Sequence, residues 1–487
     1  MASKMIEIKL EENGVDGLPE DSKSTGSRTI KDTMADGHLK EFQANQVPAK
    51  KGKDGKQSSL VTIFTIWNLT LGTSLLSIPW AIGKAGLILG PLLIVLVNLT
   101  LLYSCYLVVE GARHFESKDG YKDFNDVIRY FLGSTGEKIS CIIISIVLIG
   151  VCLIYWILAS NFLYTTVYFV RDRIIRNIHG NSSNSINMNE VVCPAVGTVN
   201  SSNFGSNWTE TDDDLLFNQY WNQTQTVPLY LILILFPILN LPSPVIFNKL
   251  SSIGILSSIY MVIFVIIKSS FWTSTVDANF ELALPTFPIV TGVVSTAFSI
   301  HANLLPVTQC NRNPQNTVRD LTIAYGCSCV TYLLVGILFI IKFPLSAQCI
   351  QSVFLDNFGP DDIMSFLGRL TLLIQNIVTC PIIAFAARIK IMSILYGEKY
   401  PSWKHVLVFN ILLTTVCVLG AIFFPNVGTI VRYVGAFGGL FYCLFLPCAV
   451  QFAIRKKENR LTVINVLSYT YVIVFGLANC IAQFFMN

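Results

Sequence analysis

Charged residues are scarce in this sequence: they make up 13% of its 487 residues, whereas hydrophobic residues make up 52%. A soluble globular domain carries about 25% charged residues, so this chain has too little polar surface to cover a globule of its size. The net charge of +4 is spread over several connecting segments and offers no basic patch to nucleic acid. We therefore expect a membrane protein that has no nucleic-acid partner.

Catalytic and metal-binding patterns are also lacking. No C-x-x-C pair and no cysteine–histidine cluster indicates a metal site. A nucleophile, a base and an acid at a spacing typical of an enzyme do not occur, nor does the selectivity loop or ring of charges that marks an ion channel. The sequence therefore predicts no enzyme, no catalytic residue and no bound metal or organic cofactor.

Long apolar runs, in contrast, are numerous. Runs such as LLIVLVNLTLLYSCYLVV and CIIISIVLIGVCLIYWIL reach the roughly 18–20 apolar residues that are needed to cross a bilayer. Backbone amides inside lipid must find partners within the segment, so these runs must be helices. We predict eleven transmembrane helices, at residues 59–83, 88–110, 139–170, 228–241, 250–271, 287–308, 321–343, 365–387, 403–424, 429–454 and 461–485.

The first 58 residues differ from the rest of the chain. They hold ten Lys or Arg, ten Asp or Glu and no apolar run, so they cannot bury enough surface to offset the entropy of ordering. We expect a disordered cytosolic tail at residues 1–58 and a transmembrane domain at residues 59–487. Most Lys and Arg residues of the short loops fall on the side of this tail, in agreement with the positive-inside rule.

This orientation places the long loop at residues 176–226 in a lumen or outside the cell. A glycan can be attached only on that side, and the loop carries four N-x-S/T acceptor sites, at Asn181, Asn200, Asn207 and Asn222. Of the thirteen cysteines, only Cys193 and Cys349 fall in predicted luminal loops. Because that compartment is oxidising, we expect these two cysteines to form a disulfide.

Polar and helix-breaking residues interrupt the first predicted helix. Gly costs about 1 kcal/mol and Pro about 3 kcal/mol relative to Ala inside a helix. A helix broken at the middle of the membrane frees backbone amides and carbonyls, which can hold the carboxylate of a zwitterion and a cation. The same residues could instead let neighbouring helices approach closely. The interruption consists of Asn68, Leu69, Thr70, Leu71, Gly72, Thr73 and Ser74, with Pro79 one turn later.

The sixth predicted helix is interrupted in a similar way, by Ser299, His301, Asn303 and Pro306. Ionisable groups at membrane depth tend to face a cavity, although a single buried histidine is more often a hydrogen-bonded packing residue. Two interrupted helices at matching positions of two five-helix halves are typical of an inverted-repeat transporter. Gly292 lies outside the interruption, so we expect its replacement by Ala to be tolerated.

The eighth predicted helix carries polar groups whose oxygens could bind a small hard cation or hydrogen-bond to neighbouring helices. They are Gln375, Asn376 and Thr379. Arg369 and Arg432 lie near predicted helix ends, where a long side chain can reach the membrane interface. We expect neither arginine to take part in chemistry.

Several motifs together resemble those of the amino acid/auxin permease-type transporters, over residues 58–486. They are Trp67-Asn68, Gly72-Thr73-Ser74, Leu76-Ser77-Ile78-Pro79-Trp80, Tyr155-Trp156, Ser160-Asn161-Phe162-Leu163, Cys193-Pro194, His301, Val318-Arg319-Asp320, Ile323-Ala324-Tyr325, Phe354-Leu355-Asp356-Asn357-Phe358, Pro425-Asn426, Arg432-Tyr433, Ala478-Asn479 and Gln483-Phe484-Phe485. The resemblance implies an all-α, eleven-helix inverted five-helix repeat, with helices 1 and 6 broken and alternating access. It implies a lysosomal or late endosomal membrane, with the plasma membrane as the alternative.

The resemblance also implies which residues form the site. The amino acid would be bound by Asn68, Thr70, Leu71, Gly72, Thr73, Ser74 and His301. A sodium ion would be bound by Thr70 and Thr379. In relatives the cation-site threonine lies three residues after the glutamine of helix eight, and that position is Val378 here.

The partners that the resemblance implies are membrane lipids and neutral or cationic amino acids, such as leucine or arginine. Relatives export essential amino acids from lysosomes in an arginine-regulated way. They also signal to the growth-controlling kinase complex 1 through Rag GTPases and Ragulator, which dock on a Tyr-rich tail, whereas residues 1–58 contain no tyrosine. The alternative is a membrane receptor, or transceptor, that senses amino acids with little transport.

Overall fold

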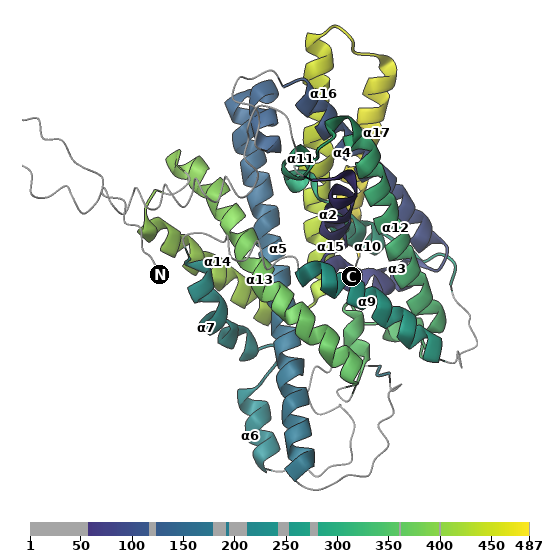
Figure 1. Ribbon diagram of the computed structural model, residues 1–487, viewed down its shortest axis with the longest axis vertical. Helices are drawn as coiled ribbons and strands as arrows, with labels where there is room; N and C mark the ends of the chain where they lie inside the picture. Colours follow the sequence, from purple (N-terminus) through teal and green to yellow (C-terminus); the bar gives the residue numbers. More distant parts are fainter. Residues whose placement is uncertain are drawn as a thin grey trace, which may run out of the picture.

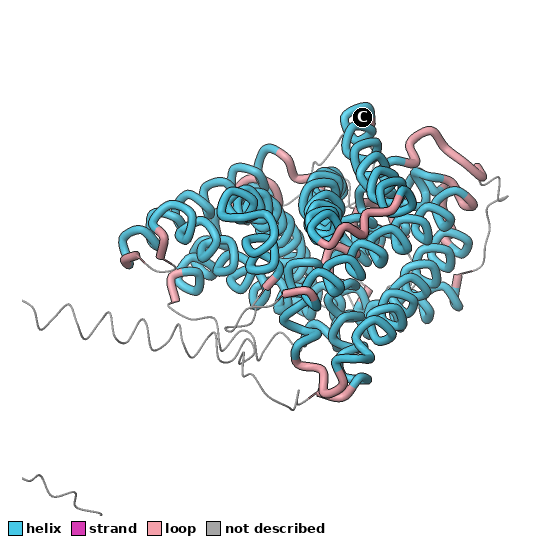
Figure 2. The backbone as a smooth tube through the Cα atoms, turned by 90° about the horizontal axis from the view of Figure 1, so that it is seen from above, coloured by secondary structure: helices cyan, strands magenta, loops and turns pink. Residues whose placement is uncertain are grey.

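The computed structural model describes residues 57–115, 123–178, 191–193, 212–241, 253–272, 281–359, 362–398 and 401–486. All elements longer than an isolated bridge are helices in this part of the chain, and they form one bundle (Figure 1). Figure 2 shows the bundle from above, with its helices side by side. The predicted tail, apart from its last two residues, and three of the four predicted glycan sites, Asn181, Asn200 and Asn207, lie outside the described residues.

The helices follow one another along the chain with few long interruptions. The first half contains α2 (Ser59–Leu71), η1 (Thr73–Ser77), α3 (Ile78–Ala85), α4 (Leu89–Arg113), α5 (Phe124–Ile178), α6 (Asp212–Tyr220), α7 (Val227–Leu239) and α9 (Ile253–Phe271). The second half contains α10 (Pro288–Ala297), α11 (His301–Gln309), η3 (Pro314–Asn316), α12 (Thr317–Lys342), η4 (Ala347–Cys349), η5 (Phe354–Asn357), α13 (Ile363–Tyr396), α14 (Trp403–Phe423), α15 (Val427–Gly438), the π segment η6 (Gly439–Phe445), α16 (Leu446–Lys457), α17 (Val463–Ala482) and η7 (Gln483–Phe485).

The number of membrane spans in the described chain is close to the eleven predicted from hydropathy. Nine helical segments of the described chain are long and apolar enough to cross a membrane, and α2 with the helix after it makes a tenth, bent by 46°. The remaining predicted span, the fourth at residues 228–241, is helix α7, which is shorter at 13 residues. The interruptions fall in the first and sixth spans, five spans apart, so the predicted fold class is confirmed.

Helix α5 is longer than its predicted span of 139–170. It begins at Phe124, has a non-helical residue at Gly133 with φ 75°, and continues to Ile178. Beyond the predicted end, Arg171 places its guanidinium 4.1 Å from the centre of the Phe217 ring of α6. Figure 1 shows α6 beside the lower end of α5. This cation–π contact supports a helix end that hydropathy does not reveal.

Helices α10 and α15 approach each other through small residues. A Cβ atom added to Gly435 of α15 would lie 2.2 Å from the carbonyl oxygen of Gly292 on α10. The Thr296 hydroxyl of α10 donates to the Val431 carbonyl of α15 at 2.7 Å. Small residues at an interface let two backbones pack this closely inside a membrane, and the contact holds the sixth span against the tenth.

Candidate functional site

The first span is broken at Gly72. Helix α2 ends at Leu71, and Gly72 has φ 39° and ψ −154°, a left-handed backbone that L side chains rarely adopt. No heavy atom lies within 4 Å of the position that a Cβ on Gly72 would take. Glycine is therefore needed here for backbone conformation, and close packing of a neighbouring helix does not explain it.

The carbonyls freed by this break are hydrogen-bonded by a tyrosine of α12. The Tyr332 hydroxyl donates to the Leu71 carbonyl at 2.9 Å and to the Thr70 carbonyl at 2.5 Å. The Thr70 hydroxyl lies 2.5 Å from that of Ser328, also on α12, and 2.8 Å from the Trp67 carbonyl. The side of α12 that carries Ser328 and Tyr332 thus supports the end of α2.

The second break lies between α10, which ends at Ala297, and α11, which begins at His301. The Tyr325 hydroxyl of α12 donates to the Phe298 carbonyl at 2.9 Å. The Phe298 ring packs against two tyrosine rings, with centroids 5.3 Å from Tyr325 and 5.5 Å from Tyr332. One helix, α12, therefore bonds to both breaks and brings them together around Phe298.

His301, a predicted substrate residue, lies in a packed cluster next to the second break. It is fully buried, and its Nε2 lies 3.5 Å from the sulfur of Cys105 on α4. The same sulfur is 3.0 Å from the Tyr325 hydroxyl. Through Cys105 and Tyr325, the histidine is linked to the second break, and no described hydrogen bond joins it to the residues around Gly72.

The other predicted residues of the first break divide between two environments. Ser74 is buried in η1, whereas Thr73 at the start of η1 is half-buried. Asn68 lies on the last turns of α2. The predicted cation residues are not brought together by any described hydrogen bond, because Thr70 bonds towards α12 while Thr379 lies on α13.

Three functional candidates on α12 were not predicted from the sequence, namely Tyr325, Ser328 and Tyr332. Their spacings of three and four residues place them on one face of the helix, which is the signal that could have found them. Asn376 of α13, which the sequence did single out, is fully buried. Neither of its amide atoms has a hydrogen-bond partner among the described residues.

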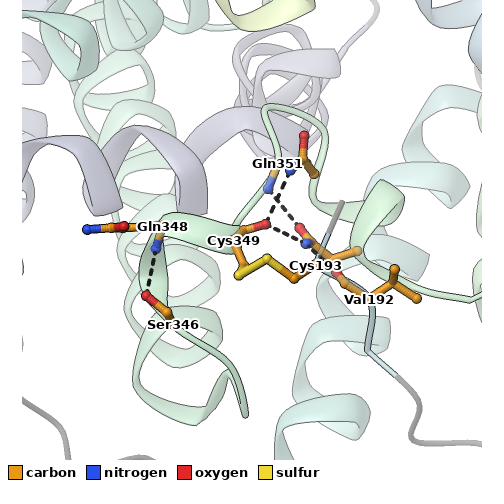
Figure 3. The surroundings of a disulfide bond; sticks show 7 residues. Val192, Cys193, Ser346, Gln348, Cys349 and Gln351 are labelled. Carbon is orange, nitrogen blue, oxygen red and sulfur yellow. Dashed lines mark hydrogen bonds between the residues drawn. A yellow bond between two sulfur atoms is a disulfide. The ribbon is translucent and has the colours of Figure 1, made fainter. Parts of the chain in front are cut away.

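The connection between α12 and α13 covers the first break at one end of the bundle. The Ser77 hydroxyl of η1 donates to the Ser352 carbonyl at 2.6 Å. Cys349 is disulfide-bonded to Cys193 with a Cα–Cα distance of 4.9 Å (Figure 3). The Asn357 amide donates to the Cys349 carbonyl at 2.8 Å. These bonds hold the connection against η1 and against the segment around Cys193.

Buried charged side chains also hold the connection between α12 and α13. The Arg369 guanidinium of α13 donates to the carbonyls of Leu355 and Phe358 at 2.7 and 3.0 Å. Burial raises the pKa of the Asp356 carboxyl. The charge of Arg369 and a hydrogen bond from the Asn161 side-chain amide lower this pKa, but by less. Lys268 and Asp362 form an ion pair of 2.9 Å in which both side chains are buried.

The expectation that two arginines reach the membrane interface is wrong. Arg369 is 4% exposed and Arg432 is 5% exposed. Arg432 donates to the Met486 carbonyl at 2.7 Å, just as Arg369 bonds to carbonyls of the connection described above. Both guanidinium groups therefore bond to backbone carbonyls inside the protein, two for Arg369 and one for Arg432.

The opposite end of the bundle is held by polar contacts near the start of α2. Gln57 pairs with Asn311 as an isolated β-bridge, and the Arg312 amide donates to the Gln57 carbonyl at 2.8 Å. The Asn311 amide donates to the buried Asp320 carboxylate at 2.8 Å. An ion pair between Lys390 of α13 and Asp123, the residue before α5, is formed as well.

Sequence comparison relates most of this chain to amino acid transporters. A family model described as transmembrane amino acid transporter protein matches residues 55–486. Neutral amino acid transporter 9 of Rattus norvegicus is 37% identical over 448 residues, which cover 88% of this chain and 80% of the relative. Sodium-coupled neutral amino acid transporter 9 homolog of Caenorhabditis elegans is 34% identical over 93% of this chain and 78% of its own length. The crystal structure of MhsT in complex with L-phenylalanine matches with a TM-score of 0.49 and 9% identity, covering 89% of this chain and 100% of that chain.

Proposed function

Because the chain belongs to the transmembrane amino acid transporter family, we propose that it moves neutral amino acids by alternating access and binds them at the first break. The observation that carries this proposal is the geometry at Gly72, where a left-handed backbone ends α2 beside open space. A broken helix inside a membrane is costly unless its free backbone groups are used. Substrate binding is the use that this family membership suggests.

The backbone around the break offers groups for both ends of an amino acid. The carbonyls of Thr70 and Leu71 end α2 and can accept hydrogen bonds from an ammonium group. The amides that follow Gly72 begin a new helical segment, whose first amides lack partners within the helix. Such amides suit a carboxylate, and broken helices of other transporters bind substrates in this way.

The compartment and the coupling ion are part of the same proposal. A lysosomal or late endosomal location is supported by the resemblance of the motifs described above. Sodium coupling is supported by the name of the relative from Caenorhabditis elegans, a sodium-coupled neutral amino acid transporter 9 homolog. Thr70 and Thr379 remain the predicted sodium residues.

Transport is tested with the purified protein in proteoliposomes. We expect saturable uptake of labelled leucine that unlabelled neutral amino acids compete away, and uptake that depends on the sodium gradient. The measurement is initial uptake rate with and without sodium, at two pH values, against empty vesicles. Binding of leucine without any flux would contradict transport and would favour a sensing receptor.

The orientation is tested at Asn222, the one predicted glycan site that the structure describes. Its side-chain oxygen accepts hydrogen bonds from the Thr224 amide at 3.0 Å and the Thr224 hydroxyl at 3.1 Å. We expect glycosidase to lower the apparent mass of the protein made in a eukaryotic host, and Thr224→Ala to remove one glycan. Gln223→Ala, which keeps the acceptor motif, should retain it. An unglycosylated wild-type protein would contradict a luminal position for residues 176–226.

A further inference from the structure

Tyr332 is placed to act on the first break. Its side chain is fully buried, and its single hydroxyl donor is shared between the carbonyls of Thr70 and Leu71. Because α2 ends at Leu71, these carbonyls no longer receive bonds from amides four residues further on. A buried carbonyl without a partner is unfavourable, so the hydroxyl stabilises the broken conformation when the site holds no ligand.

An ammonium group would satisfy the same two carbonyls better than a phenol does. Tyrosine has one O–H donor, whereas an ammonium group has three N–H donors. Hydrogen bonds from a charged donor are roughly twice as strong as bonds between neutral groups. Gly72 directly follows these carbonyls in the chain, and no heavy atom lies within 4 Å of the position of a Cβ on it, which leaves room there for part of a ligand.

We propose that the Tyr332 hydroxyl stands in for the α-ammonium group of the substrate: it holds the Thr70 and Leu71 carbonyls in the empty protein and releases them when an amino acid binds. The inference rests on the proposed function, since it takes the first break as the substrate site. Tyr332 is thus a positioning residue that competes with the substrate for the carbonyls and lowers its apparent affinity.

The competition between Tyr332 and the substrate predicts the direction in which the apparent Kd changes. A ligand that must displace a bond of the empty state binds more weakly by the equilibrium constant of that bond. Tyr332→Phe removes the hydroxyl but keeps the ring that packs on Phe298. We expect the apparent Kd for leucine to fall about five- to tenfold, since one or two net hydrogen bonds are involved. We expect turnover to fall as well, because release slows.

Tyr325→Phe is the matched control. It removes a buried hydroxyl from the same helix, one that donates to the Phe298 carbonyl of the second break. Both variants should melt at a lower temperature than the wild type in the absence of ligand. Only Tyr332→Phe should show an enlarged increase of Tm on addition of leucine, because ligand binding restores partners to its carbonyls.

The probes are labelled L-leucine for Kd, unlabelled L-leucine for thermal shift and 4-methylpentanoic acid, which has the leucine skeleton without the ammonium group. The acid should neither compete with leucine nor raise Tm in any variant. If Tyr332→Phe does not survive extraction, it is purified with each probe: recovery with leucine alone supports the proposal, and recovery with neither overturns it.

Two results separate this inference from the proposed function. Leucine binding to Tyr332→Phe that equals or is weaker than wild-type binding overturns the role of Tyr332, and so does an equal gain of affinity in Tyr325→Phe. In both cases amino-acid transport by the wild type still stands. A wild-type protein that neither binds nor transports any amino acid overturns the proposed function, and this inference fails with it.

Discussion

Gly72→Leu is expected to reduce amino-acid transport to the background of empty vesicles while the protein remains folded. An L residue in a left-handed conformation costs about 1–2 kcal/mol, and leucine favours a continuous helix. A continuous helix would use the Thr70 and Leu71 carbonyls for its own hydrogen bonds. The Cβ of the new side chain would meet no heavy atom within 4 Å, so we expect folding to tolerate the substitution despite the backbone strain.

Gly326→Leu is the matched control for this substitution. Gly326 lies inside α12, and a Cβ on it would also meet no heavy atom within 4 Å, but its backbone is helical. We expect normal transport from Gly326→Leu, and monodisperse protein of normal glycosylation from both variants. Uptake by Gly72→Leu at the wild-type rate would contradict the assignment of the break, and so would a failure of this variant to fold.

Gly435→Ala is expected to have the largest effect on stability. The new Cβ would lie 2.2 Å from the Gly292 carbonyl oxygen, so α15 and α10 would have to move apart. Overpacking typically costs 1–3 kcal/mol and occasionally more, and a contact with backbone cannot be relieved by a rotamer change. We expect loss of the monodisperse peak in size-exclusion chromatography, together with a lower Tm of any protein that remains.

Gly439→Ala, one turn further along, provides the comparison for this clash. Its Cβ would lie 3.3 Å from the Ser295 Cβ, a far milder contact than 2.2 Å from a carbonyl oxygen, so we expect a monodisperse protein. Gly435→Ala with wild-type stability would show that the α10–α15 contact is looser than described. The structure also argues against the expectation that Gly292 can be replaced, because its Cβ would lie 2.8 Å from the Arg432 carbonyl oxygen.

Hydropathy and helix-breaking residues predicted the spans and both breaks. The reason is physical: bilayer thickness sets the length of each apolar run, and the cost of Gly72 inside a helix is a local property of the chain. Extra length beyond the lipid, as at the end of α5, leaves no signal in hydropathy. Its support comes from a ring on α6, far away in the sequence.

The site could be predicted only in part, because its contacts join distant segments. The sequence identified the backbone break but not the donors that satisfy it, since Tyr325 and Tyr332 resemble ordinary apolar residues of a buried helix. The sequence did not show that Arg369 is buried, because its carbonyl partners lie on an irregular connection that the sequence does not reveal. The sequence placed His301 at the second break and among the substrate residues, but it did not reveal the contact of His301 with Cys105.

The disulfide near the first break also bears on how the protein withstands proteolysis. Cys193 and Cys349 are separated by 156 residues, and the chain from α6 to α12 lies between them. A single cut anywhere in that stretch leaves two fragments that are still covalently joined. In a compartment rich in proteases, a nicked chain would therefore keep both of its halves, and with them both broken helices, in one molecule.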